Sequence, residues 1–465
     1  MSAYEAAIAA NRFGFGARPG DLARIGSHAR EALKQQLRGP APLLPEALEA
    51  SHTLLARVQD ARTARREAGG DAQPSALANA KVLRDIYRPA YVADVQARVR
   101  AAITREADFL ERLVHFWSNH FAVSVDKPAV LGLAGAMERE AIRPHVLGNF
   151  ADMLLAVEQH PAMLLYLDNA RSIGPDSAAA RGAAARGRQL GLNENLGREI
   201  LELHTLGVNG GYTQQDVQSL AAIITGWSLG GGAGRLRGGE PGKFHFREAF
   251  HQPGAKLLLG RRYADDGVSQ GRAALRDLAL HPRTAAHLAR KLACHFVADD
   301  PPSSLLARLE RAYLDSRGDL AALYGALIDS REAWQQPLAK FKTPTDYLYS
   351  AYRALQLAAP DPSGSGRVLD LRAFELLGQR PFQPGSPAGW PDRSADWDGS
   401  AALLKRLEWA QEVGQRLGSR RDAVQVADAV LGGTLTGATR TGLSRAQDGA
   451  QALTLLLASP EFMRR

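Results

Sequence analysis

The spacing of apolar side chains constrains this chain more than any other feature. Apolar residues recur at the three- and four-residue spacing of an α-helix along most of the sequence, whereas the strict alternation of half-buried strands is almost absent. Only residues 244–246 and 255–259 suggest strands, and these two segments can pair as a short ribbon. We therefore expect an all-α fold, a large globular array of helices with a few long loops and at most a short β-ribbon.

The length of the chain allows a substantial core. Its 465 residues, 45% of them hydrophobic, are enough for two to three domains. We expect an N-terminal helical region at 1–101, a central region at 102–260 with a glycine-rich loop at 230–243, and a C-terminal helical region at 261–465. The last region holds a loop rich in Pro and Trp at 378–398, a type of loop that often covers a site.

Charge and cysteine content argue against several classes of protein. The net charge is +8, but the arginines are dispersed and interleaved with acids, so we do not expect nucleic-acid binding. Cys294 is the only cysteine, which rules out an intrachain disulfide. The sequence shows no signal peptide and no apolar run of membrane length. We expect a soluble cytoplasmic protein without a membrane span, and export to the periplasm with a signal-bearing partner stays open.

A histidine interrupts the apolar face of the segment 106–121. At about 100° per residue, His120 falls on the same face as Phe116 and Trp117, while His115 points the opposite way. Two interpretations are open. His120 is either a core histidine bonded to a carbonyl or a buried acid, or it belongs to a catalytic or metal site.

A glutamate interrupts the apolar face of the segment 192–206 in the same manner. A carboxylate such as Glu199, buried without a partner, would cost several kcal/mol, so a cation, a shared proton or a metal must face it. One interpretation pairs Glu199 with an arginine such as Arg139 or Arg143. The other makes it a general base whose pKa is moved toward neutrality by burial.

A divalent metal is the further possibility, with Glu199, Glu202 and Asn195 as ligands. Their hard oxygen atoms would favour Mg, Ca or Mn, and adding His120 would favour Fe or Zn. The sequence contains no named catalytic or metal motif such as H-E-x-x-H. A metal site therefore depends on tertiary packing that brings these residues together.

Three helical segments carry these candidates, and we expect them to pack together: residues 105–122, 147–170 and 192–207. Helical phase predicts that His120 and Glu199 are largely buried, with His115 more exposed than His120. We also expect Asn119 or His120 to lie close to the edge that carries Glu199.

The loop at 244–260 supplies two further candidate catalytic residues, His251 and Lys256. Its aromatic residues can anchor it, and its basic groups can face an anionic ligand or balance buried acids. We expect it to lie over the polar flank of the 192–207 helix, with the Trp390 loop as a second wall. The alternative is an exposed hairpin whose histidines contact only water.

Several segments resemble a bacterial family known as domain of unknown function 1800. They are RLVHFWSNHF (112–121), HPAMLLYLDNA (160–170), NENLGREILELHTLGVNGGYTQQDV (193–217) and PFQPGSPAGWPD (381–392). The resemblance covers essentially the whole chain. The chain departs from the family pattern at His160 and Gln252, where we expect Asp, and in an Arg/Ala run that follows Asp168 and Asn169. If the expected acids help to hold a cation, that site is altered in this chain.

The resemblance implies no established activity. It does imply a neighbour, because members are often encoded beside a family of sulfatase-like fold, domain of unknown function 1501. Two hypotheses follow. The protein is an enzyme, metal-dependent or acid–base, with a buried Glu/His/Asn site, or it is a non-catalytic helical scaffold that binds a partner such as the sulfatase-like protein.

Overall fold

The computed structural model describes residues 2–67, 76–106, 108–231, 238–335, 338–357, 371–418 and 420–465. Helices dominate this part of the chain, and the strands within it form only two small two-stranded sheets, so the all-α prediction is confirmed. Part of the glycine-rich loop, residues 232–237, lies outside the described residues.

The first helices are α1 (Ser2–Ile8), α2 (Asp21–Ile25), α3 (Ala29–Leu37), α4 (Ser51–Glu67), α5 (Ala76–Val82), α6 (Arg88–Thr104), α7 (Asp108–His120), α8 (Ala134–Met137), α9 (Phe150–Glu158) and α10 (Pro161–Tyr166). The middle of the chain forms α11 (Ala178–Ala184), α12 (Asn195–Glu199), α13 (Gln214–Ile223), α14 (Val268–Ala279), α15 (Pro282–Phe296), α16 (Ser303–Asp315), α17 (Leu320–Asp329) and α18 (Pro344–Ala354). The last helices are α19 (Leu371–Leu376), α20 (Ser400–Leu417), α21 (Ala423–Leu431), α22 (Gly437–Ser444), α23 (Gly449–Ala458) and α24 (Pro460–Met463). Wider π-helical turns occur at η1 (Ala9–Phe13), η2 (Leu83–Tyr87), η4 (Glu138–Ile142) and η7 (Ile200–His204).

The strands pair differently from the single ribbon that the sequence suggests. Strand β2 (Phe244–Phe246) pairs antiparallel with β1 (Trp227–Leu229), and β3 (Lys256–Leu258) pairs with β4 (Arg261–Tyr263). The turn between β3 and β4 contains Leu259 at φ 49° and Gly260 at φ 75°. Two central residues with positive φ are the mark of a tight hairpin turn, and this local turn gives β3 a closer partner than β2.

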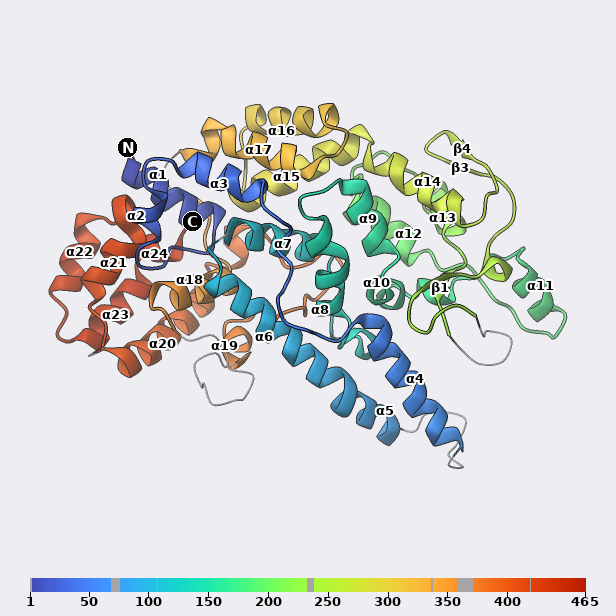
Figure 1. The fold of residues 1–465 in the computed structure, drawn as a ribbon. Coiled ribbons are helices and arrows are strands. Elements are labelled where there is room, and N and C mark those ends of the chain that lie inside the picture. The colour runs from blue at the N-terminus through green and yellow to red at the C-terminus, as the bar shows by residue number, and fades with distance from the viewer. Residues whose placement is uncertain are drawn as a thin grey trace.

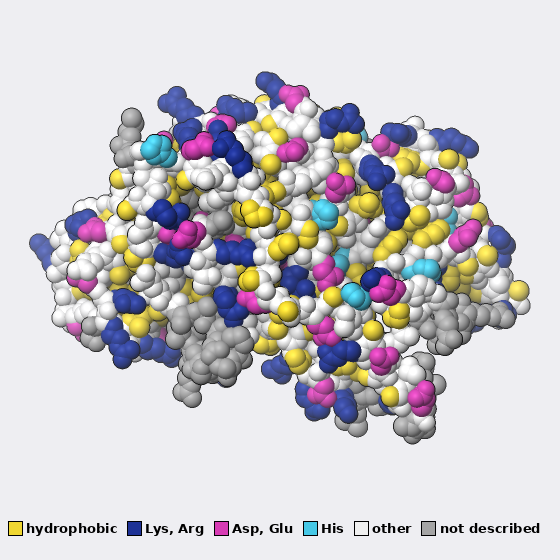
Figure 2. All heavy atoms as spheres, in the orientation of Figure 1, with side chains coloured by type: hydrophobic (Ala, Val, Ile, Leu, Met, Phe, Trp, Pro, Cys, Tyr) yellow, Lys and Arg dark blue, Asp and Glu magenta, His cyan; other side chains and the backbone are white. Residues whose placement is uncertain are grey.

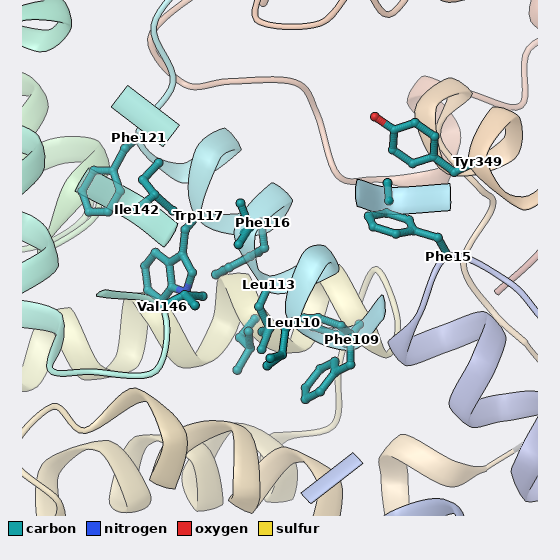
Figure 3. Close-up of a cluster of buried hydrophobic side chains, with 14 of the residues drawn as sticks. Phe15, Phe109, Leu110, Leu113, Phe116, Trp117, Phe121, Ile142, Val146 and Tyr349 are labelled. Atoms are coloured by element: carbon teal, nitrogen blue, oxygen red, sulfur yellow. The ribbon is translucent and has the colours of Figure 1, made fainter. Parts of the chain in front are cut away.

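One continuous cluster of buried apolar side chains runs from Ile8 to Met463 and crosses all three regions expected from the sequence. At one end of the molecule, α1 and α2 lie against the C-terminal helices (Figure 1). Helix α7 lies deep in this core, and every side chain from Asp108 to Trp117 is buried. Figure 3 shows the aromatic and leucine side chains that α7 contributes to the cluster.

The surface of the protein is mixed in character. On the face drawn in Figure 2, basic, acidic and apolar side chains are interspersed rather than gathered into one band. Among the described residues, no helix combines the length and the apolar character needed to cross a bilayer.

Candidate functional site

The three helical segments expected to converge do meet, and His204 is the meeting point. His120 at the end of α7 is 1% exposed, and its Nε2 lies 3.1 Å from the backbone oxygen of His204 in η7. The Nδ1 of His204 lies 2.7 Å from Oε1 of Glu158 at the end of α9, and both side chains are fully buried. The ring of His287 in α15 completes the group, 6.1 Å from that of His120.

The carbonyl contact gives His120 the environment of the core-histidine interpretation. Burial lowers its pKa well below the ordinary value, and the positive charge of Lys291 acts in the same direction, as would protonation of His287 or His204. His115 is more exposed than His120, as predicted, but at 8% it is buried as well. Its ring contacts Phe15 and Tyr349, which cover the face of α7 that the sequence suggests is open.

The prediction that Glu199 is largely buried is wrong, because the signature helix changes its winding. After α12 the chain continues as the π-helical turn η7, so buried positions recur every four residues, at Leu196, Ile200 and His204. With this wider turn, the side chain of His204 faces the core. In a regular α-helix, the side chain of Glu199 would face the core instead. Glu199 lies instead on the flank of the buried face and is partly exposed.

The carboxylate of Glu199 has no hydrogen bond or ion pair with any described residue of the chain. Burial raises its pKa, and the negative charges of Glu202 and Glu158 add to this effect, while His204 and Arg198 oppose it. The predicted arginine partners are engaged elsewhere, because Arg139 pairs with Asp94, and Arg143 pairs with Glu111 and Glu138. Glu199 is therefore an unpaired carboxylate at the edge of a buried polar cluster.

The other predicted ligands do not join Glu199 in a metal site. Asn195 is exposed, and Glu202 forms a 3.6 Å ion pair with Arg198. Across the ranges that the structure describes, no three His, Cys, Asp or Glu side chains are grouped so as to hold a metal ion. The predicted metal set of Glu199, Glu202, Asn195 and His120 is not assembled in this structure, because His120 points to a backbone carbonyl and the two acids lie on the helix flank.

The two loop candidates serve the local fold of the 244–260 segment. His251 is 6% exposed, and its Nδ1 lies 3.0 Å from the backbone oxygen of Thr225. The ammonium group of Lys256 donates to the carbonyl of Gln252 at 2.7 Å. The segment packs on α13, where the Leu259 amide donates to Asp216 at 2.7 Å.

The Pro/Trp loop lies over α7. The side chain of Asn119 forms two hydrogen bonds with the backbone of Trp390. Its Oδ1 accepts from the Trp390 N–H at 2.7 Å, and its Nδ2 donates to the Trp390 carbonyl at 2.9 Å. The Val125 amide donates to the carbonyl of Phe382 at 2.9 Å. A Cβ atom on Gly389, which has φ of 82°, would stand 2.4 Å from the Asn119 carbonyl, so this close approach requires glycine.

A cavity of about 80 Å³ lies beneath the segment 379–392. Its polar lining comes from α6, α7, α15, the start of α18 and the loop itself: Arg98, His115, Ser118, Asn119, His295, Thr343, Thr345, Asp346, Gln379, Arg380 and Asp392. By the usual measure such a volume accommodates several water molecules or one small ligand.

A carboxylate–histidine pair joins the loop to α15 at this cavity. Oδ1 of Asp392 lies 2.9 Å from Nδ1 of His295. Burial lowers the pKa of His295 to about 4, although Asp392 opposes the shift. Burial alone would raise the pKa of Asp392, but His295, Lys291 and Lys340 outweigh it and hold the pKa at about 2. At neutral pH the pair is therefore a carboxylate and a neutral imidazole whose Nδ1 donates.

Asp346 lines the same cavity and is the shared partner of two buried arginines. It accepts a hydrogen bond from Nη2 of Arg112 at 2.9 Å, and its Oδ2 forms an ion pair with Nε of Arg465 at 2.8 Å. Burial opposes ionisation, yet the two guanidinium groups hold the pKa of Asp346 well below its usual range. Sequence periodicity gave no sign of this network, since its members lie more than 100 residues apart.

We expect Asn119→Ala to loosen the loop without unfolding the protein. The substitution removes both hydrogen bonds to Trp390 and leaves its backbone groups without these partners, at a cost of about 1–3 kcal/mol. Limited proteolysis should then cut the segment 379–392 faster than in the wild type. Asn209→Ala, at an exposed turn, is the matched control, and equal cleavage of both variants would contradict the role of Asn119.

Comparison with known proteins identifies the family. The model of the family described as "Protein of unknown function (DUF1800)" matches residues 8–464. No curated protein and no solved structure matches the chain, and these comparisons give no support for a sulfatase-like partner. Because the match covers nearly the whole chain, the resemblance seen in the sequence is confirmed: the chain belongs to the DUF1800 family of proteins of unknown function.

Proposed function

We propose that the protein is an acid–base enzyme in which Glu199 takes up and releases a proton. The observation that supports this most directly is the state of its carboxylate, which is half-buried, reachable from solvent and unpaired among the described residues, with a raised pKa. A general acid or base works best when its pKa lies near the working pH and its oxygen atoms are free to meet a substrate.

The neighbours of Glu199 suit this role. Burial is the main cause of its raised pKa, and the negative charges of Glu202 and Glu158 act in the same direction. Glu158 is itself held against His204 in the core. His120 is in this proposal a positioning residue, because its ring contacts the carbonyl of His204 and thereby supports the π-helical turn that follows Glu199. His251 and Lys256 keep their structural contacts and have no role in the proton transfer.

The protonation of Glu199 can be tested without a substrate. A carboxyl group whose folded-state pKa is raised destabilises the folded state above its unfolded pKa, and this penalty disappears as the pH falls below that value. We therefore expect Glu199→Gln to be more stable than the wild type at pH 7, with a difference that vanishes near pH 4. Urea denaturation across this range measures it. Glu408→Gln, at an exposed position of α20, should stay within about 0.5 kcal/mol of the wild type.

The proposed catalytic role of Glu199 requires that the protein turn over a substrate. We expect the wild type to turn over a member of a panel of chromogenic esters, phosphate esters and glycosides, because cleavage of each of these bonds needs proton transfer. Loss of a general acid or base typically costs 10²–10⁴-fold in rate, so Glu199→Gln should fall by about that factor and Glu408→Gln should not change. A Glu199→Gln variant with the wild-type rate would remove Glu199 from the mechanism.

A further inference from the structure

The cavity beneath the segment 379–392 is separate from the proposed function of Glu199, and its surroundings carry an unusual excess of buried positive charge. Four cationic side chains with at most 1% exposure lie around Asp346: Arg112, Lys342, Arg406 and Arg465. Asp346 forms ion pairs with Arg112 and Arg465 and also acts on Lys342 and Arg406. Asp392 acts on Arg465 as well, and Asp398 acts on Arg406. Three carboxylates thus act on four cations, and Asp392 is also engaged by His295, Lys291 and Lys340, so the group keeps an excess of positive charge.

Lys342 shows how strong the excess is. Its Nζ has no hydrogen-bond partner among the described residues and lies 4.7 Å from the centre of the Phe462 ring. Burial lowers its pKa to about 7, and the charges of Arg112, Arg465 and Arg406 act in the same direction against Asp346. A buried lysine has a lowered pKa when too little negative charge lies nearby to compensate its ammonium group.

The cavity itself adds donors to this positive field. Arg98 and Arg380 line it. Arg98 is already paired with Glu138 at 2.7 Å, whereas Arg380 is about half exposed, and its one ion pair with a described residue is a long 3.9 Å contact to Glu375. Ser118 and Thr345 add hydroxyl groups to the lining. The two carboxylates of the lining are already compensated, Asp346 by Arg112 and Arg465, and Asp392 by His295 with Lys340 and Lys291. A ligand entering here meets the guanidinium group of Arg380 and the two hydroxyl groups in a positive potential.

We propose that this cavity is a binding site for a small oxyanion, the carboxylate group of a short organic acid, with Arg380 as a direct ligand at its mouth. The size of the cavity agrees with this class, because about 80 Å³ is roughly half the volume of a cavity that holds benzene. Guanidinium groups bind carboxylate and phosphate oxygens with paired hydrogen bonds, so inorganic phosphate shares the chemistry and is the second arm of the test.

Isothermal titration calorimetry with the full chain, at constant ionic strength, tests the proposal. Acetate and propionate should bind saturably with one site per chain, and chloride should not compete at equal concentration. Arg380→Gln should weaken binding at least tenfold. Arg393→Gln, at an exposed arginine that pairs with Asp300 outside the cavity lining, should bind as the wild type does. Melting curves of both variants confirm that they are folded.

Each outcome decides the question. Binding of acetate or propionate that depends on Arg380 supports the proposal, and Arg380-dependent binding of phosphate alone assigns the site to phosphate and overturns the carboxylate. Failure of both anions to bind, or binding that Arg380→Gln leaves unchanged, overturns the site. Glu199→Gln should bind the anion normally, so a failure of the Glu199 mechanism is distinguishable from a failure of this site.

Discussion

Replacing Asp346 by Asn should destabilise the protein by about 3–5 kcal/mol, one of the two largest effects we expect. The carboxylate is the shared partner of Arg112 and Arg465, both of them 1% exposed, and it acts on Lys342 as well. Breaking a buried ion pair from one side leaves uncompensated charge in the core, which costs far more than the pair contributes when intact. Urea denaturation at pH 7 measures the loss as a lower midpoint.

Asp300→Asn provides the matched comparison for Asp346→Asn. Asp300 pairs with Arg393, but the two side chains are 77% and 62% exposed, so solvent screens the pair and the change should cost less than about 1 kcal/mol. If Asp346→Asn costs no more than Asp300→Asn, the cations around Asp346 are compensated by some other group. Anion binding in the cavity would then be the first explanation to examine, with urea curves repeated in the presence of acetate.

Much of the fold followed from periodicity, since burial of one face is a local property of a helical sequence. The helix containing His120, its burial and its packing beside the signature helix were predictable from the spacing of Phe116, Trp117 and their neighbours. The same reasoning failed at Glu199. It assumed 3.6 residues per turn, and the wider turn at Ile200–His204 brought His204 into the core.

The cavity could not be predicted from the sequence, because its groups are distant along the chain. Asp392 and His295 are 97 residues apart, and no spacing rule connects them. The sequence did single out the loop that carries Asp392, through its prolines and Trp390, as a segment that often covers a site. Glu158 offers a further signal, a carboxylate at the end of the apolar helix 150–158, but the sequence does not show that His204 is its partner.

Acid should destabilise the protein between pH 6.5 and 4, before most carboxylates titrate. The pKa of both His287 and His295 falls to about 4 on folding, and burial is the main cause in each case. His115 and His120 shift in the same direction. The unfolded chain, with histidine pKa values near 6.5, then binds more protons than the folded chain in this window. Stability is therefore complete above about pH 6.5 and is lost as the pH falls toward 4.

The size of the acid effect follows from the shifts. A histidine whose pKa moves from 6.5 to about 4 contributes roughly 3 kcal/mol that is lost once the pH is below 4. Asp94 opposes the trend, because burial raises its pKa to about 6 and the folded state gains its proton first, between about pH 6 and 4. Burial also raises the pKa values of Glu199 and Asp108, which oppose the trend in the same way. Since four buried histidines act against these three carboxyl groups, the net slope should still favour unfolding. The carboxyl groups of Glu140 and Asp392, with pKa values of about 2, add their losses only below about pH 4.

Urea denaturation at several pH values from 7.5 to 4.5 measures this slope directly. His287→Gln should reduce the proton uptake on unfolding by about one at the steepest part of the curve, because it removes one group that is neutral when folded and charged when unfolded. His28→Gln, at an exposed position, should leave the slope as it is. A stability that stays flat or rises from pH 7 to 4.5 would mean that these histidines are charged in the folded protein. The polar cluster around His120 and His204 would then need an additional buried anion, beyond Glu158, to hold that charge.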